Sequence, residues 1–204
     1  MAKIKALLKK YSQITNERFF EDVVIKQEYK HAFNKKADVI IDVGALAGEF
    51  GVYMYGKAKI IHAIEPYSKA YEELTSNIRD FNLKKIKPYR LALSNYNGEG
   101  SLVISEGRGG NKLVVGDGSD KTEKVEVKTL ARFIKDENIE RVDILKIDIE
   151  NTEYEVFTAP DFKEIADRID FIIGEHANEE VAHTLRMTGF DFMRTPRGFY
   201  AKRK

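Results

Sequence analysis

The sequence predicts an α/β fold with an open, mostly parallel sheet that ends in an antiparallel hairpin. Short apolar runs rich in β-branched residues alternate along the chain with segments of helical periodicity. Several of these runs are apolar without interruption, which suits strands that are buried on both faces of a parallel sheet. The last segment, residues 189–203, has the pattern of two strands that turn at 195–198.

Composition indicates one globular domain with a substantial core. The chain has 204 residues, of which 43% are hydrophobic, and its 34 Lys and Arg nearly balance 33 Asp and Glu. This balance argues against a chain that binds nucleic acid through its overall charge. The absence of cysteine excludes disulfides, zinc ribbons and thiol nucleophiles. No signal peptide and no membrane span are visible, so we expect a cytoplasmic protein.

The first half of the chain alternates helix and strand. Residues 1–36 are expected to form an N-terminal helical cap, ahead of a main domain over 37–204. From Ala37 the run VIIDVG predicts the first strand, followed by a short helix over 47–56. A second strand at 59–64 leads to a helix over 67–81, where apolar residues recur at helical spacing.

The second half adds further strands and one glycine-rich segment. A third strand is expected over 86–92, and further strands at SLVIS (101–105) and 124–130. The segment 106–120 carries five glycines, so we expect no regular element there, only an active-site lid or a solvated connection. Two more buried strands, 141–149 and 168–176, are each followed by helical sequence.

The residues after the first two strands favour a nucleoside ligand. Gly44 and Gly48 allow the chain to turn sharply and to approach a ligand closely. Glu65 ends the second strand, where a carboxylate can accept both hydroxyls of a ribose. Asp42 can bind the amino-acid end of a cofactor or support the glycine loop. Because the glycine pattern lacks a dinucleotide or phosphate-loop spacing, S-adenosylmethionine fits better than a pyrophosphate cofactor.

Seven fragments occur in an order and spacing that resemble FkbM-type methyltransferases. They are DVGALAG (42–48), IEP (64–66), NI (77–78), LALSNYNGEG (91–100), VKTL (127–130), LKIDIENTEYEV (145–156) and GEH (174–176). The resemblance implies a Rossmann-like, seven-stranded class I methyltransferase sheet with S-adenosylmethionine across the ends of the first two strands. It also implies methyl transfer, usually to a hydroxyl of a small molecule or sugar. The residues expected at the cofactor are Asp42, Gly44, Ala45, Gly48, Glu65, Pro66, Ala92 and Leu93.

The chain departs from the family pattern near the expected acceptor. Asn151 and Thr152 stand where the family usually has Gly and Ala. Ala131 and Arg132 replace an Asp that is common after the VKTL-like segment. The acceptor is therefore the part of the function that the sequence specifies least.

The candidate catalytic groups are four residues that follow two neighbouring predicted strands. We call Asp148, Glu150, Glu175 and His176 the acidic edge. Asp148, Glu175 or His176 could take the proton of an acceptor hydroxyl as a general base. Alternatively the same three residues could hold a divalent cation, although we do not expect a metal, or they could be structural. His62 lies inside a buried strand and is expected to be a core residue.

Two other functions remain open. Residues 1–36 carry nine Lys or Arg against four Asp or Glu, so an RNA methyltransferase could use these helices as a platform. A cofactor-binding module without catalysis is also compatible with the altered segment at 151–152. We expect a hydroxylated small molecule as the partner and no nucleic acid, and the sequence leaves the oligomeric state open.

Overall fold

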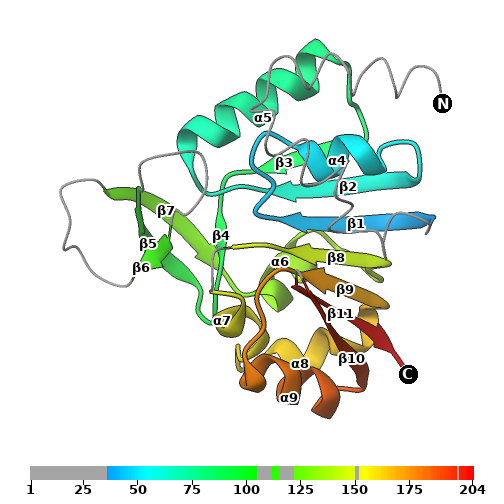
Figure 1. The fold of residues 1–204 in the computed structure, drawn as a ribbon. Coiled ribbons are helices and arrows are strands. Elements are labelled where there is room, and N and C mark those ends of the chain that lie inside the picture. Colours follow the sequence, from blue (N-terminus) through cyan, green and yellow to red (C-terminus); the bar gives the residue numbers. More distant parts are fainter. Residues whose placement is uncertain (1–35, 105–111, 115–121, 150–151, 197) are drawn as a thin grey trace.

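The computed structural model describes residues 36–104, 112–114, 122–149, 152–196 and 198–204. Its centre is a seven-stranded sheet in the order β10-β11-β9-β8-β1-β2-β3 (Figure 1). Five strands are parallel: β1 (Ala37–Val43), β2 (Ala58–Ile64), β3 (Ile86–Tyr89), β8 (Ile144–Ile147) and β9 (Phe171–Gly174). The hairpin of β10 (Phe190–Thr195) and β11 (Gly198–Arg203) joins β9 antiparallel. The predicted mostly parallel sheet with a C-terminal hairpin is confirmed.

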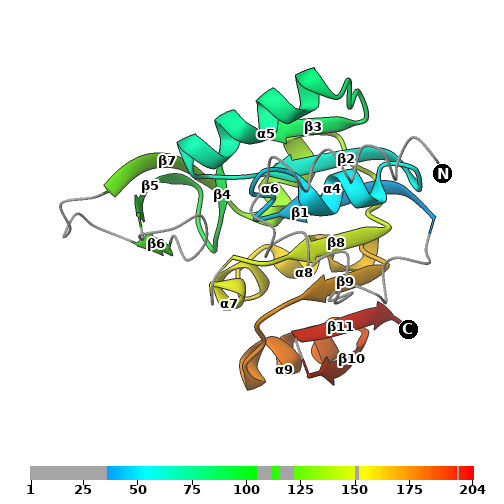
Figure 2. The ribbon, with the colours of Figure 1, turned by 45° about the horizontal axis from the view of Figure 1, so that its top comes forward.

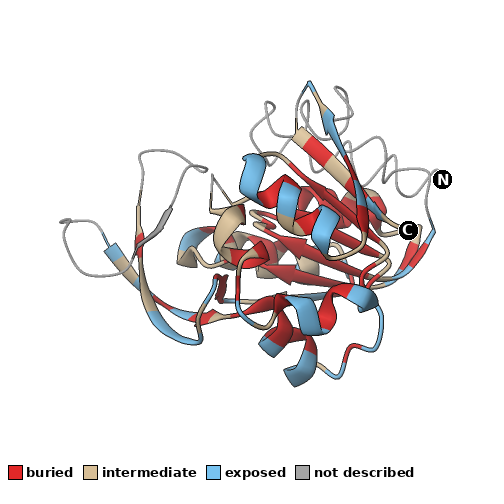
Figure 3. Ribbon diagram, turned by 90° about the horizontal axis from the view of Figure 1, so that it is seen from below, coloured by how far each residue is buried: buried red, intermediate tan, exposed pale blue. Residues whose placement is uncertain are grey.

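Helices cover both faces of this sheet because apolar side chains alternate between the faces along each strand. On one face, the core includes residues of α4 (Glu49–Met54) and α5 (Ser68–Asp80). The other core includes residues of α6 (Leu130–Asp136), α7 (Glu153–Phe157), α8 (Phe162–Ile165) and α9 (Glu179–Met187), and a short 3₁₀ turn (Ala166–Arg168) follows α8. Figure 3 shows that the strands of the main sheet are largely buried. None of the helices in the described residues is long and apolar enough to span a membrane.

A second, four-stranded sheet lies beyond the carboxyl ends of the parallel strands, in the order β4-β7-β5-β6 (Figures 1 and 2). Its strands are β4 (Ala92–Leu93), β5 (Gly98–Val103), β6 (Lys112–Val114) and β7 (Thr122–Lys128). The predicted third strand over 86–92 is therefore divided. β3 ends at Tyr89 in the main sheet, whereas Ala92 and Leu93 pair with Val127 and Lys128 of β7.

The expectation of no regular structure over 106–120 is wrong at one point. Lys112–Val114 forms β6 and pairs antiparallel with Ser101–Val103. The glycines of this segment lie at 107, 109, 110, 116 and 118. The apolar run between the two groups contains none, so it can form an extended strand and pair with β5. The rest of the segment, and the expected N-terminal cap except Lys36, lie outside the described residues.

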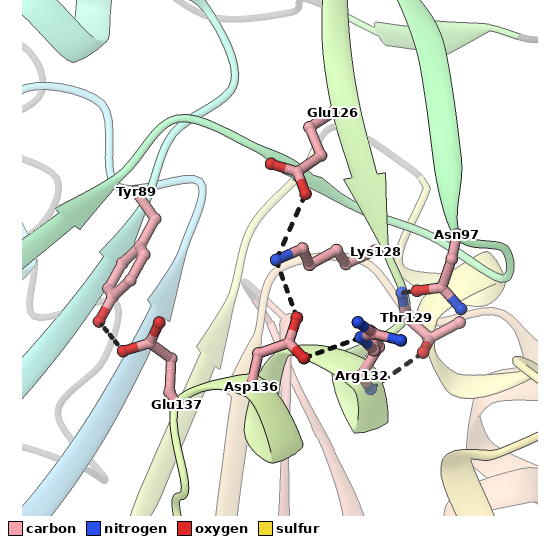
Figure 4. Close-up of polar contacts among 8 residues, drawn as sticks. All are labelled: Tyr89, Asn97, Glu126, Lys128, Thr129, Arg132, Asp136 and Glu137. Carbon is pink, nitrogen blue, oxygen red and sulfur yellow. Dashed lines mark hydrogen bonds and ion pairs between the residues drawn. The ribbon is translucent and has the colours of Figure 1, made fainter.

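Helix α6 was not predicted, and polar contacts fix its start beside the second sheet. The Thr129 side chain accepts the N–H of Arg132 at 3.1 Å, while Asn97 accepts the N–H of Thr129 at 3.0 Å (Figure 4). The Asp136 carboxylate binds Lys128 at 2.9 Å and Arg132 at 2.8 Å. These contacts connect the end of β7 to the helix that covers the main sheet.

His62 is a core residue, as expected. Its Nδ1 lies 2.9 Å from the hydroxyl of Tyr89, which donates to Glu137 at 2.6 Å. The rings of His62 and Tyr89 are stacked, and each of them makes a T-shaped contact with the ring of Phe133. Burial lowers the pKa of His62 to about 4, so this imidazole is neutral near pH 7.

Candidate functional site

Four neighbouring strands end in register, which aligns the residues that follow them. Val43 is paired with Ile64 of β2 and with Ile147 of β8, and Ile147 is paired with Gly174 of β9. The next residues therefore form a row along the carboxyl edge. In order across the sheet, they are Glu65, Gly44, Asp148 and Glu175. Ligands of open α/β sheets bind at this edge.

The glycine loop, residues 44–48, joins β1 to α4 and is held against the end of β2. The N–H groups of Gly44 and Ala45 both donate to the carbonyl of Ile64 at 3.0 Å. The loop has three positive φ angles, at Gly44 (74°), Leu46 (47°) and Gly48 (98°). At Gly44, a Cβ atom would also overlap the carbonyl oxygen of Asp148. Only glycine lets the loop lie this close to the chain that follows β8.

Glu65 holds the glycine loop from the side of β2. Its Oε2 accepts the N–H of Leu46 and its Oε1 accepts the N–H of Tyr67, both at 2.9 Å. The side chain is buried, and burial raises its pKa to about 7 despite these two hydrogen bonds. A carboxylate oxygen can accept two hydrogen bonds, so each oxygen retains one further acceptor site.

Two buried side chains that we had assigned no role also hold the glycine loop. Asn77, on α5, donates through Nδ2 to the carbonyl of Ala47 at 3.1 Å. Lys146, on β8, donates through Nζ to the carbonyl of Gly44 at 2.7 Å. Both residues belong to fragments that carry the family resemblance, NI (77–78) and LKIDIENTEYEV (145–156), but neither fragment indicated what these side chains contact. The loop is thus fixed by side chains from β8, from α5 and from the residue after β2.

Asp42 lies within β1 and not in the loop itself. Its side chain has no exposed surface, and Oδ1 lies 3.2 Å from Nζ of Lys146. Burial raises the pKa of Asp42, and the nearby ammonium of Lys146 opposes that shift. Asp42 pairs with Lys146, which itself binds the loop, and both roles expected for Asp42 stay predictions.

The remaining residues expected at the cofactor lie in two places. Ala45 is buried in the glycine loop and Pro66 is half-buried after Glu65, both next to the row. Ala92 and Leu93 form β4, and their side chains are buried in two different apolar clusters. Contact of Ala92 and Leu93 with an adenine ring stays a prediction.

The acidic edge is more open than the glycine loop. The side chain of Asp148 is 26% exposed, while those of Glu175 and His176 are 40% and 41% exposed. Nε2 of His176 lies 3.5 Å from Oε2 of Glu175, a distance at which the carboxylate can stabilise a protonated imidazole. Glu150 lies outside the described residues.

Glu153 is a buried carboxyl group beside this edge. Its Oε1 accepts the N–H of Ile149 at 3.1 Å, which fixes the turn directly after Asp148. Burial raises the pKa of Glu153, His176 lowers it and Asp148 raises it further. Glu153 is part of the resembling fragment, but nothing in the sequence indicates that its side chain accepts the N–H of Ile149.

The spacing of the carboxylate and imidazole groups bears on the alternative of a metal site. In the part of the chain that the structure describes, no three His, Asp or Glu side chains are grouped so that they could hold a metal ion. Asp148, Glu175 and His176 therefore share an edge without forming a ligand set in this conformation.

Comparison with known proteins gives a consistent match. Residues 42–195 match the family described as Methyltransferase FkbM domain. The methyltransferase sdnD of Sordaria araneosa is 26% identical in an alignment 184 residues long, and the match covers 74% of this chain and 71% of that protein.

Solved structures share the fold at low sequence identity. The FkbM methyltransferase from Methylobacillus flagellatus KT superposes with a TM-score of 0.58 and 13% identity, over 82% of this chain. The chain spans only 44% of that structure. A Streptococcus mutans protein solved in complex with S-adenosylhomocysteine (SAH) gives a TM-score of 0.54 at 12% identity, over 87% of this chain and 97% of that one.

Proposed function

The chain belongs to the FkbM methyltransferase family, and from this premise we propose that it methylates a hydroxyl oxygen of a small molecule or sugar with S-adenosylmethionine. The observation that carries the proposal is the row of residues along the carboxyl edge. Glu65 and the first residue of the glycine loop, Gly44, stand at one end, and Asp148 and Glu175 stand at the other. One half suits a nucleoside and the other suits an acceptor that must lose a proton.

The donor and acceptor set around the glycine loop fits S-adenosylmethionine. Both oxygens of Glu65 already accept a backbone N–H, and each can still accept a ribose hydroxyl. The loop closes tightly without a phosphate-binding glycine pattern. The relative from Streptococcus mutans, which shares the fold, was solved with SAH. These points support a nucleoside cofactor at Glu65 and the loop.

When bound, S-adenosylmethionine supplies an electrophilic methyl group. The chain's own task is to hold the acceptor oxygen in line with that group and to remove the proton of the acceptor. We assign the proton to Nε2 of His176 or to the carboxylate of Asp148. Glu175, 3.5 Å from His176, would stabilise the imidazolium that forms.

The acceptor class follows from the openness of the acidic edge. Asp148, Glu175 and His176 are partly exposed, whereas Glu65 and Asp42 are buried. Exposed acceptors of hydrogen bonds suit a polar molecule with several hydroxyls, and their negative charge disfavours a phosphate backbone. This contrast supports a hydroxylated small molecule over RNA.

Incubation of the full chain with a cell extract and methyl-labelled S-adenosylmethionine tests the proposal. We expect the label in one small hydroxylated compound, recovered as a methyl ether by mass spectrometry. Label in RNA would favour the RNA methyltransferase instead. If the chain bound the cofactor but left all fractions unlabelled in extracts rich in sugars and secondary metabolites, the non-catalytic module would replace our proposal.

A further inference from the structure

The buried ammonium group of Lys146 lies between the two halves of the proposed site. Lys146 is paired with Asp42 on the neighbouring parallel strand. The alternation of side chains along β8 also places Asp148 on the same face as Lys146. The side chain of Lys146 is 5% exposed, although lysine is almost never buried without a partner.

The Nζ atom of Lys146 contacts both the cofactor side and the acceptor side. On the cofactor side it donates to the carbonyl of Gly44 at 2.7 Å and to that of Val43 at 3.2 Å, and it lies 3.2 Å from Oδ1 of Asp42. On the acceptor side it lies 3.8 Å from Oδ2 of Asp148. One side chain therefore donates a hydrogen bond to the start of the glycine loop and lies within ion-pair distance of a proposed general base.

Lys146 is charged in this position. Burial by itself lowers the pKa of a lysine, but the carboxylates of Asp42, Asp148 and Glu65 raise the pKa of Lys146 above its ordinary value. A buried ion pair adds little to stability, because the desolvation of both charges offsets their attraction. Stability alone therefore gives a weak reason for a lysine at this position, whereas its contacts with both sides give a specific one.

We propose that Lys146 is a positioning residue that sets the glycine loop and Asp148 relative to each other. The proposal rests on the function proposed above. Glu65 and Asn77 hold the loop at Leu46 and Ala47, on the cofactor side. Lys146 differs from them because its ammonium also reaches Asp148. Loss of the ammonium should therefore weaken cofactor binding and slow the transfer step as well.

The test compares Lys146→Met with Lys128→Met. Methionine keeps most of the stem and removes the ammonium. Lys128 is a suitable control because its ammonium is also ion-paired, with Glu126 and Asp136, and neither of these partners belongs to the row at the carboxyl edge (Figure 4). We expect Lys146→Met to weaken SAH binding about tenfold or more by calorimetry, because a charged donor to the loop carbonyl is lost. The Lys128→Met variant should bind SAH within twofold of wild type.

A double variant separates positioning from folding. Lys146→Met alone leaves Asp42 buried without its cation, which can destabilise the fold. Asp42→Asn combined with Lys146→Met removes both charges, so its melting temperature should recover relative to the single variant. The loop carbonyls still lack their donor in the double variant. We therefore expect SAH binding to stay about tenfold weaker while stability recovers.

Each outcome decides the inference. If the double variant folds and binds SAH within twofold of wild type, Lys146 is a structural ion-pair partner only and the inference is wrong. If wild type itself does not bind SAH, the proposed function fails, and the result is distinct from failure at Lys146. On an identified acceptor, kcat of the double variant at saturating S-adenosylmethionine should remain about tenfold or more below wild type. An unchanged kcat would remove the link to Asp148.

Discussion

Gly44 and Asp148 meet backbone to backbone at the carboxyl edge of the sheet. A Cβ atom on Gly44 would overlap the carbonyl oxygen of Asp148, and φ of Gly44 is 74°. The two chain segments that follow β1 and β8 are therefore in direct contact. The glycine loop and the acidic edge therefore share this backbone contact.

Gly44→Ala should destabilise the protein and abolish cofactor binding. The methyl group clashes with a backbone atom that cannot rotate away, and the positive φ adds strain, so we expect a loss of about 2 kcal/mol or more. Gly98→Ala is the matched control, because Gly98 also has a positive φ (151°) but its Cβ would meet nothing within 4 Å. Urea unfolding of both variants measures the difference. Equal destabilisation would show that the contact with Asp148 has no energetic consequence.

The free energy of unfolding should depend on the protonation of two buried acids. Burial raises the pKa of Glu49 and of Glu65 from 4.5 to about 7. Between these values the folded state retains protons that the unfolded state has released, so stability falls as the pH rises from about 4.5 to 7. His62 acts in the opposite direction below about 6.5, because burial lowers its pKa to about 4.

Comparison with Glu65→Gln isolates the contribution of Glu65. The variant cannot ionise, so wild type should lose stability relative to it as the pH rises from 5 to 8. Glu164→Gln, an exposed position on α8, controls for the substitution itself. Urea unfolding at four pH values within this range gives the difference. A difference that does not change with pH would show that Glu65 is not buried as the structure describes.

Asp148→Asn and His176→Ala should slow turnover without weakening cofactor binding. If either group is the general base, we expect about 10²- to 10⁴-fold lower kcat on an identified acceptor, because proton transfer occurs only on the way to the transition state. SAH affinity should stay within a few-fold, and a chelator should have no effect. Activity that a chelator abolishes and a divalent ion restores would assign these residues to a metal instead.

RNA binding should be weak and sensitive to salt. The charges of the whole chain nearly cancel, and the carboxyl edge proposed for catalysis carries Asp148 and Glu175. Filter binding at two salt concentrations measures the affinity and its salt dependence. Sub-micromolar binding at physiological salt that is lost when the lysines of residues 1–36 are reversed would favour the RNA methyltransferase.

Most of the main sheet could be predicted because all of its strands except β3 carry a local pattern of their own. Continuous apolar runs identify β1, β2, β8 and β9, and the turn residues at 195–198 identify the hairpin. The second sheet could not be predicted, because it depends on pairing between residues distant in sequence, such as Ala92 with Val127. The runs at 141–149 and 168–176 also predicted longer strands than β8 and β9. Outside these two strands, Val142 and Ile169 form an isolated bridge.

The candidate site also contains residues that the sequence could predict and residues that it could not. Gly44, Glu65 and Asp148 directly follow strands, so sequence position alone predicts their common edge. Lys146 and Asn77 could not be predicted as supports of the glycine loop, because their roles depend on which backbone carbonyl lies within reach of the side chain in the folded chain. Only the tertiary structure shows that side chains from β8, from α5 and from the residue after β2 converge on the five residues of the glycine loop.

Calorimetric titration of SAH into wild type and Glu65→Ala tests the central claim most directly. We expect wild type to bind SAH in preference to NADH and ATP, and Glu65→Ala to lose about 1 to 3 kcal/mol of binding free energy, the range for lost hydrogen bonds to a charged group. Circular dichroism and the Glu164→Ala control establish that the fold is retained. Preference for NADH or ATP, or unchanged SAH binding by a folded Glu65→Ala variant, would contradict the placement of S-adenosylmethionine at the ends of β1 and β2.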